Sequence, residues 1–134
     1  MEWAFLQGVM LKLGFPKGWV KLIMGCVTTT SFSILINGNP HGHIIPSRGL
    51  RQGDPISPYL FLLCAERFTS LLQHVEVEGR IHGLSICRWV PTISYLLFAD
   101  NSPIFCRASH DEIKVINDIL TLYEEASGQC ISLK

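Results

Sequence analysis

Charged side chains are scarce in this sequence. Only 16% of its 134 residues are Asp, Glu, Lys or Arg, and the formal net charge is zero. Because domains that bind nucleic acid on their own usually carry a basic excess, the composition does not indicate one. Hydrophobic residues make up 48% of the chain, which predicts apolar surface that further chain or a partner covers.

Patterns typical of zinc centres, disulfide frameworks and membrane proteins are also missing. The five cysteines form no CxxC pair and no cluster with histidine, which argues against zinc and indicates reduced thiols inside a cell. Met1 is followed by acidic Glu2 rather than by a basic signal-peptide region, and the long uncharged stretch 22–47 is interrupted by polar residues and prolines. We therefore expect an intracellular protein, nuclear or cytoplasmic, without a signal peptide, a transmembrane segment or a membrane partner.

Apolar residues at helical spacing predict four helices. The first covers 2–13 and stops at Gly14, and the second starts at Pro16. The third covers 58–75, begins at the capping residue Ser57, and is expected to pack on a sheet. The apolar stripes of the second and third helices are Trp19, Val20, Ile23 and Cys26, then Leu60, Phe61, Cys64, Phe68, Leu71, Leu72 and Val75.

The fourth helix begins at a capping box, Ser109 to Glu112, and ends at Gly128. Its expected core face is Ile113, Ile116, Ile119, Leu120 and Tyr123. Shorter apolar runs predict antiparallel strands between the helices. These strands are 28–36 and 43–45, joined by the hairpin turn Asn37-Gly38, then 84–86 and 130–133. Helices alternating with hairpins predict an α+β class in one domain, 1–134.

The most informative strand pair lies within 93–106, where one apolar run leads to Asp100 and a second leads away from it. Asp100, Asn101 and Ser102 supply turn chemistry, and two buried strands would hold the carboxylate rigidly enough for a metal ligand. From this hairpin alone, an ordinary Asx turn between core strands is the favoured interpretation. Pro103 cannot donate to a ladder, which predicts an open edge there or a loss of constraint on the strand.

A second candidate is the loop 47–58, with two glycines, two prolines and two arginines. Arg48 and Arg51 can reach phosphate. Gln52 can donate to a sugar or a base, and Gly53 lets the backbone approach a nucleotide. Taken alone, the loop is better explained as a turn into a capped helix with solvated arginines. Asp54 is a possible metal ligand, although its place before a proline favours a turn or cap role.

Chemistry with two metal ions needs two or three carboxylates that converge on ions about 4 Å apart. Asp100 is the best single candidate, and the adjacent Asn101 offers an oxygen without charge. Loop, solvent-face, cap and helix-surface positions explain the other acids considered: Asp54, Glu66, Asp111, Glu112 and Asp118. The five histidines show no ligand spacing and are interpreted as surface or turn residues.

Together these motifs resemble a non-LTR (LINE-type) retrotransposon reverse transcriptase of the kind found in plants. The segment 48–61 resembles the family's loop and following helix, and 97–100 resembles its catalytic hairpin about forty residues later. The segments 2–15 and 127–134 resemble the stretches that follow the family's first aspartate motif and its catalytic hairpin. The likeness covers essentially the whole chain in the family's order.

The resemblance implies a polymerase palm with part of the fingers: an antiparallel sheet with a catalytic β-hairpin tip and helices on one face. It also implies two Mg²⁺ ions, an RNA template, a DNA primer and a dNTP. Asp100 matches a metal-binding aspartate, and Phe98 matches the often aromatic residue two places before it. Gln52 and Gly53 match the nucleotide- and template-binding loop, which Arg51 and Asp54 shape.

The sequence also departs from the family pattern. Asn101 stands where the family usually has a second aspartate, and the family's upstream aspartate precedes the segment that Glu2 begins. We expect a palm fragment, truncated at both ends, that is catalytically inactive because one carboxylate holds two divalent ions poorly. An active RNA-directed DNA polymerase is the first alternative. The second is a binding remnant that contacts RNA or a protein through Arg48–Arg51 and exposed apolar faces.

Overall fold

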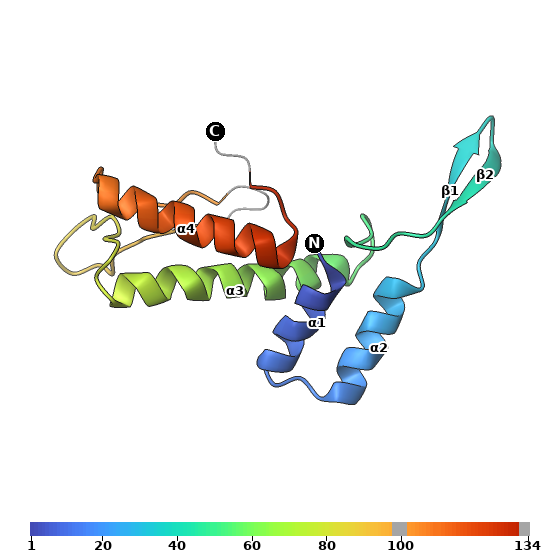
Figure 1. Cartoon of the computed structure of the whole chain (residues 1–134), viewed down its shortest axis with the longest axis horizontal. Helices are drawn as coiled ribbons and strands as arrows, with labels where there is room; N and C mark the ends of the chain where they lie inside the picture. The colour runs from blue at the N-terminus through green and yellow to red at the C-terminus, as the bar shows by residue number, and fades with distance from the viewer. Residues whose placement is uncertain (98–101, 132–134) are drawn as a thin grey trace. The chain divides into compact units, whose positions relative to one another are not determined.

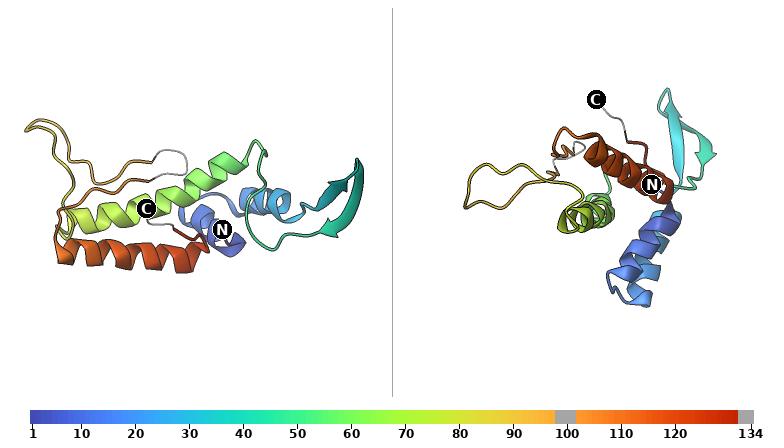
Figure 2. Two further views of the ribbon diagram at one scale, coloured as in Figure 1. Left: turned by 90° about the horizontal axis from the view of Figure 1, so that it is seen from above. Right: turned by 60° about the vertical axis from the view of Figure 1, so that its left-hand side comes forward.

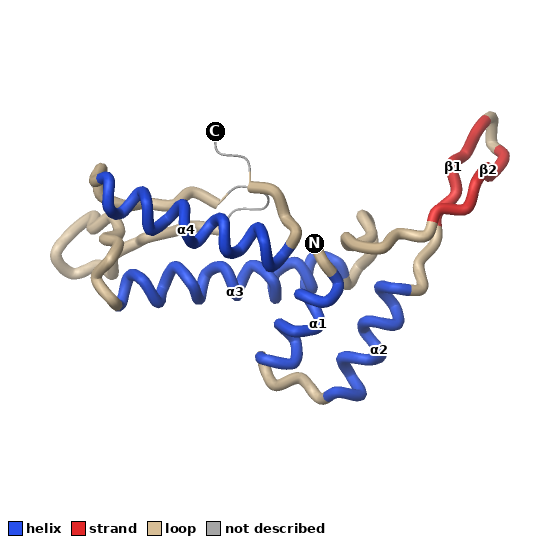
Figure 3. Tube along the Cα trace, viewed as in Figure 1, coloured by secondary structure: helices blue, strands red, loops and turns tan. Residues whose placement is uncertain are grey.

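The structure is a computed structural model that describes residues 1–97 and 102–131 (Figure 1). Its elements are α1 (Trp3–Lys12), α2 (Lys17–Thr28), β1 (Phe32–Ile36), β2 (Asn39–Ile44), α3 (Ser57–Val77) and α4 (His110–Ser127). The predicted α+β class is confirmed by these four helices and the antiparallel β1–β2 hairpin (Figure 3). None of the helices in the described parts of the chain is long and apolar enough to span a membrane.

The chain divides into two compact units according to its internal contacts. Unit 1 comprises Met1–Cys64 with Ser127–Gln129, and unit 2 comprises Ala65–Ala126 with Cys130–Lys134. Helix α3 therefore contributes its first turns to unit 1 and its remaining turns to unit 2. Each unit has a buried apolar cluster of its own, which is described separately below.

The helices of unit 1 form where the sequence predicts them. Helix α1 ends before Gly14, whose φ of +85° suits glycine. The core consists of Leu6, Met10, Val20, Ile23, Val27, Leu60 and Cys64. The predicted stripe of α2 is wrong at both ends: Trp19 is 39% exposed and stacks on Phe15 at a ring distance of 4.6 Å, and Cys26 is exposed. Val27 takes the buried position because it lies seven residues after Val20.

The β1–β2 hairpin forms around the predicted turn. Asn37 and Gly38 have φ angles of 49° and 80°, the left-handed pair that a two-residue hairpin turn requires. The strands are shifted from their predicted bounds, because α2 continues to Thr28 and β2 starts directly after the turn. Every residue of both strands is exposed, including Ile34 at 58% and Leu35 at 70%. This hairpin is therefore held by backbone pairing rather than by a core.

In unit 2, α3 and α4 run antiparallel and side by side (Figures 1 and 2). The rings of Phe68 of α3 and Tyr123 of α4 pack against each other, with their centroids 5.1 Å apart. The buried apolar residues of this unit are Ala65, Phe68, Leu72, Val75, Ile81, Ile116, Ile119, Leu120 and Tyr123. The buried face of α3 thus meets helices in both units, which corrects the expectation that it packs on a sheet. Phe61 of α3, at 38% exposed, and Ile113 of α4, at 47%, were also wrongly assigned to the core.

Strand pairing in unit 2 is sparser than predicted. Within the described residues it consists of two antiparallel bridges, Leu84 with Ile93 and Tyr95 with Ile104. Of the predicted strand 84–86, only Leu84 pairs. For the predicted last strand, Cys130 and Ile131 have no strand assignment, and 132–134 lie outside the described residues.

Candidate functional site

The predicted catalytic hairpin is described on both sides of its tip. Phe98, Asp100 and Asn101 themselves lie outside the described residues. Two backbone hydrogen bonds join the runs on either side of these residues. In the first, the N–H of Leu96 donates to the carbonyl of Pro103 at 3.0 Å. The N–H of Phe105 donates to the carbonyl of Ser94 at 2.7 Å. The two runs that flank the acid therefore pair antiparallel, as the sequence predicts.

The run that leads to the tip is paired along both of its edges. Ile93 exchanges two backbone hydrogen bonds with Leu84, at 2.8 and 2.9 Å. On the other edge, Ser94 and Leu96 bond to the segment 103–105. Consecutive residues of a strand point their backbone groups to opposite edges, so this alternation is expected of a central strand. We refer to 82–84, 92–96 and 103–107 as the three paired segments, with 92–96 in the centre.

The position of Pro103 corrects the prediction of an open edge. Its carbonyl accepts from Leu96, so its backbone faces the central segment rather than an open edge, although the residue itself is exposed. The N–H and C=O groups of one strand residue point to the same edge, so proline lacks the donor that would bond back to Leu96. Pro103 therefore contributes only an acceptor to the pairing closest to the tip.

The loop 48–57 is fastened to unit 1 at both ends. Near its start, the indole Nε1 of Trp3 donates to the carbonyl of Gly49 at 2.7 Å, and the Gly49 N–H donates to the carbonyl of Met1 at 2.8 Å. Leu50 and Ile56 are partly buried against the apolar cluster of unit 1. Two apolar anchors and these hydrogen bonds hold the polar residues between them on a fixed backbone.

Between those anchors the predicted binding residues face solvent. Arg51, Gln52 and Gly53 are exposed, and Gly53 has a φ of +82° that favours glycine. The Arg51 guanidinium carbon lies 6.0 Å from the ring centroid of Phe32, at the outer limit of a cation–π contact. Arg48 instead pairs with Glu2 at 3.6 Å. Arg51 and Gln52 are therefore adjacent polar residues that are both exposed to solvent on this loop.

Asp54 serves the turn that leads into α3. Its Oδ1 accepts from the N–H of Ile56 at 3.0 Å, and its carbonyl accepts from Ser57 at 3.1 Å. This is the turn role that its place before a proline predicts. Ser57 is the first residue of α3 rather than the capping residue before it that the sequence predicted.

Among the described residues, no three His, Cys, Asp or Glu side chains lie close enough together to hold a metal ion. A magnesium site at the tip would therefore depend on Asp100 and on the neutral amide oxygen of Asn101. Mg²⁺ is held through carboxylates in phosphate-transfer sites. The described residues therefore do not supply a donor set for the two ions that the family resemblance implies.

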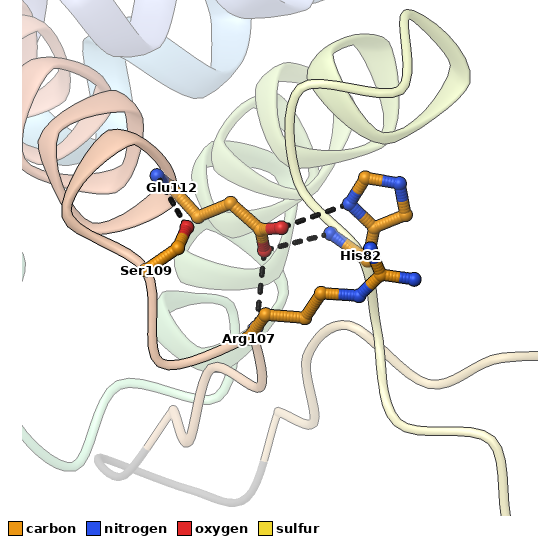
Figure 4. A network of polar contacts seen from close by, with 4 residues as sticks. All are labelled: His82, Arg107, Ser109 and Glu112. Carbon is orange, nitrogen blue, oxygen red and sulfur yellow. Dashed lines mark hydrogen bonds and ion pairs between the residues drawn. The ribbon is translucent and has the colours of Figure 1, made fainter.

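A polar network in unit 2 surrounds a carboxylate that the sequence assigned to a cap (Figure 4). Ser109 caps α4 as predicted, because its Oγ accepts from the Glu112 N–H at 3.2 Å. The Glu112 carboxylate, however, turns away from Ser109. It accepts from the His82 N–H at 3.0 Å, from the Arg107 N–H at 3.0 Å, and contacts the His82 Nδ1 at 2.8 Å. Glu112 is only 6% exposed and joins the two outer paired segments.

Two opposing effects set the ionisation of Glu112. Burial raises the pKa of this carboxyl, while the hydrogen bonds from the His82 backbone and ring and from the Arg107 backbone lower it. The net effect is a pKa below the ordinary value of 4.5, so the carboxylate stays charged. Burial, followed by the Glu112 charge, raises the pKa of the nearby Cys106 thiol.

Glu76, near the end of α3, contacts the central paired segment. Its two carboxylate oxygens accept from Ser94 Oγ at 2.7 Å and from Thr92 Oγ1 at 3.1 Å. This role was not predictable from the sequence, since Glu76 directly follows the predicted helix 58–75. Glu112 did carry a signal: it precedes Ile116 by four residues, on the face of α4 that is buried.

Comparisons with known proteins agree with the resemblance. A family profile described as "Reverse transcriptase (RNA-dependent DNA polymerase)" matches residues 1–134. An uncharacterized mitochondrial protein of Arabidopsis thaliana is 50% identical over 68 residues, which are 51% of this chain and 56% of that protein. A retrovirus-related Pol polyprotein from a type-2 retrotransposable element of Drosophila melanogaster is 36% identical over 69 residues, 52% of this chain and 6% of the polyprotein.

Proposed function

This chain belongs to the reverse transcriptase (RNA-dependent DNA polymerase) family, and we propose that it is the palm region of a non-LTR retrotransposon enzyme that no longer polymerises DNA. The retrotransposon origin is supported by the similarity to the Drosophila polyprotein. The loss of polymerisation rests on one feature of the tip, the neighbouring pair Asp100 and Asn101.

The paired strands on both sides of the tip support this assignment. Three antiparallel segments, two of which flank Asp100 in the sequence, are the arrangement that a palm hairpin needs, and 93–96 and 103–105 provide its flanks. In this proposal Asp100 is a metal ligand, and Asn101 occupies the place of a second carboxylate. Without that charge the tip attracts a divalent ion less strongly, because the affinity of such sites follows the charge of their ligands.

The loop 48–57 is the proposed nucleotide and template contact of the ancestral enzyme. Exposed Arg51 and Gln52 stand on a backbone that Trp3 and Ile56 hold in place. Arg51 would pair with phosphate, and Gln52 would donate to a sugar or base. Phe98 is assigned to the same nucleotide and template contact by the resemblance alone. An RNA template, a DNA primer and a dNTP are the substrates proposed for the ancestral enzyme.

A primer-extension assay tests the proposal. The purified chain is incubated at high concentration with a DNA primer on an RNA template, dNTPs and Mg²⁺. We expect no extension product, while a known reverse transcriptase in the same buffer extends the primer. Extension by the native chain that is lost in Asp100→Ala would show an active polymerase and overturn the proposed inactivity.

The exposure of Arg51 and Gln52 favours a second function, a binding remnant that contacts RNA through this loop. Such binding would weaken as salt rises, because phosphate contacts release counterions. Arg51→Ala should lower the affinity for single-stranded RNA and reduce the slope of log affinity against log salt by about 0.7. Arg67→Ala, an exposed arginine on α3, is the matched control. Absence of RNA binding by the native chain at low salt would remove this function.

A further inference from the structure

Two glutamates from two different helices bind all three paired segments of unit 2. Glu76 of α3 holds the central segment through the hydroxyl groups of Thr92 and Ser94. Glu112 of α4 holds the outer segments through the backbone N–H groups of His82 and Arg107. Neither carboxylate is explained by the loop 48–57 or by the predicted metal ligands.

The geometry of the central segment makes the Glu76 contacts specific to its register. Thr92 and Ser94 are two residues apart, so their side chains point to the same face of the strand. That face meets α3, while the backbone groups of Ile93 and Ser94 bond to the outer segments on the two edges. A shift of the segment by one residue would turn both hydroxyl groups away from Glu76 and break both strand pairings.

Burial makes these hydrogen bonds costly to lose. Ser94 is 3% exposed, and its Oγ bonds to Glu76 at 2.7 Å, a short distance typical of a hydroxyl donating to a charged carboxylate. Glu112 is similarly buried, and two of its partners are backbone N–H groups. A buried donor that loses its acceptor destabilises the fold around it. The three paired segments would be the first part of the fold to lose stability.

We propose that Glu76 and Glu112 are positioning residues, which hold in register the three paired segments, two of which flank Asp100 in the sequence. The importance of this register rests on the proposed function, in which Asp100 is a metal ligand. The positions of the segments themselves depend only on the hydrogen bonds described above. A palm tip needs such support, because a ligand must be held rigidly to bind productively.

Hydrogen exchange of the full-length native chain by NMR tests this role directly. The reporting amides are Leu96 and Phe105, which bond across the flanks of the tip. Glu76→Ala is expected to lower their protection at least about tenfold, with Val20 of α2 unchanged, because local opening is set by local contacts. Glu76→Gln keeps one oxygen acceptor and should restore part of that protection. Glu66→Ala, an exposed acid on the same helix, should change it less than about twofold.

A pH profile provides the matching readout for Glu112. The groups that face its carboxylate are the His82 ring and backbone, the Arg107 backbone and the Cys106 thiol. In the native chain, the amide resonances of His82 and Arg107 should shift as Glu112 is protonated, and the protection of Phe105 should fall over the same pH range. Glu112→Gln should abolish this shared transition, while Asp111→Asn should leave it in place.

These outcomes separate the positioning role from the proposed function. Unchanged protection of Leu96 and Phe105 in Glu76→Ala, or an unaltered pH transition in Glu112→Gln, would overturn the positioning role. Loss of protection throughout the chain, including Val20, would overturn it too, because it would show general destabilisation. None of these readouts depends on polymerisation, so primer extension by the native chain would contradict the proposed inactivity without altering them.

Discussion

Two antiparallel hairpins in this chain are held in different ways. The β1–β2 hairpin follows a strong turn signal, Asn37-Gly38, yet all of its side chains are exposed. The pairing of 93–96 with 103–105 surrounds a weaker turn signal, but glutamates from two helices bind its backbone and side chains. The first hairpin is therefore specified locally, whereas the second depends on contacts from distant parts of the sequence.

The largest expected effect comes from comparing a buried leucine of unit 2 with an exposed leucine of the β1–β2 hairpin. Leu72 of α3 is fully buried, so Leu72→Ala should lower the free energy of unfolding by about 2–5 kcal/mol. Leu35 of β1 is 70% exposed, so Leu35→Ala should cost no more than about 0.5 kcal/mol. Urea denaturation measures both. A similar cost for the two variants would show that the β1–β2 hairpin is covered in solution.

The second prediction concerns pH. The pKa of Glu112 is lower in the folded chain than the ordinary 4.5, so the unfolded chain binds the proton more readily. Its contribution to stability is complete above about pH 5 and is lost as the pH falls through the folded pKa. Urea midpoints measured down to about pH 3 should fall less steeply for Glu112→Gln than for native protein. Equal slopes would mean that the carboxylate is not bonded as described; Asp111→Asn serves as the control.

A smaller effect is expected at the β1–β2 turn. Gly38 has a φ of +80°, so Gly38→Ala should destabilise the hairpin by about 1 kcal/mol. Gly8 in α1 has no such φ, and an added Cβ there meets nothing within 4 Å. Gly8→Ala should therefore stabilise α1 by about 0.5–1 kcal/mol. Amide exchange in β1 and in α1 measures the two local effects, and a stabilising Gly38→Ala would contradict the left-handed turn.

The smallest predicted effect is on the thiol of Cys106, in the third paired segment. Burial raises the pKa of Cys106, and the Glu112 charge raises it further. Glu112→Gln should shift the pH profile of Cys106 alkylation to lower pH, because the nearby negative charge is removed. Exposed Cys87, followed by mass spectrometry in the same samples, should keep its profile. A Cys106 profile unmoved by Glu112→Gln would remove the proposed charge effect.

Much of the helical structure was predictable from the sequence, since α1, α2, α3 and α4 follow apolar periodicity and recognisable stop signals. The errors have physical causes. Ile113 was expected in the core, but the neighbouring Glu112 is buried instead, because hydrogen bonds from three donors compensate for burying its charge. Local periodicity cannot show such compensation, since His82 lies thirty residues away.

The candidate site was predictable only in part. The role of Asp54 in the turn followed from its place before proline, and the pairing around the tip followed from two apolar runs. The role of Glu76 did not, because its partners Thr92 and Ser94 are brought to it only by the folded chain. The assignments of Phe98, Asp100 and Asn101 remain predictions, since these residues lie outside the described parts of the structure.

Titration with Mn²⁺, followed by water-proton relaxation, tests the central claim most directly. If Asn101 has removed the charge that a polymerase tip needs, the native chain should bind Mn²⁺ weakly, and Asn101→Asp should bind at least about tenfold more tightly. Adding Asp100→Ala to that variant should abolish the gain. Tight Mn²⁺ binding by the native chain, equal to that of Asn101→Asp, would contradict the account.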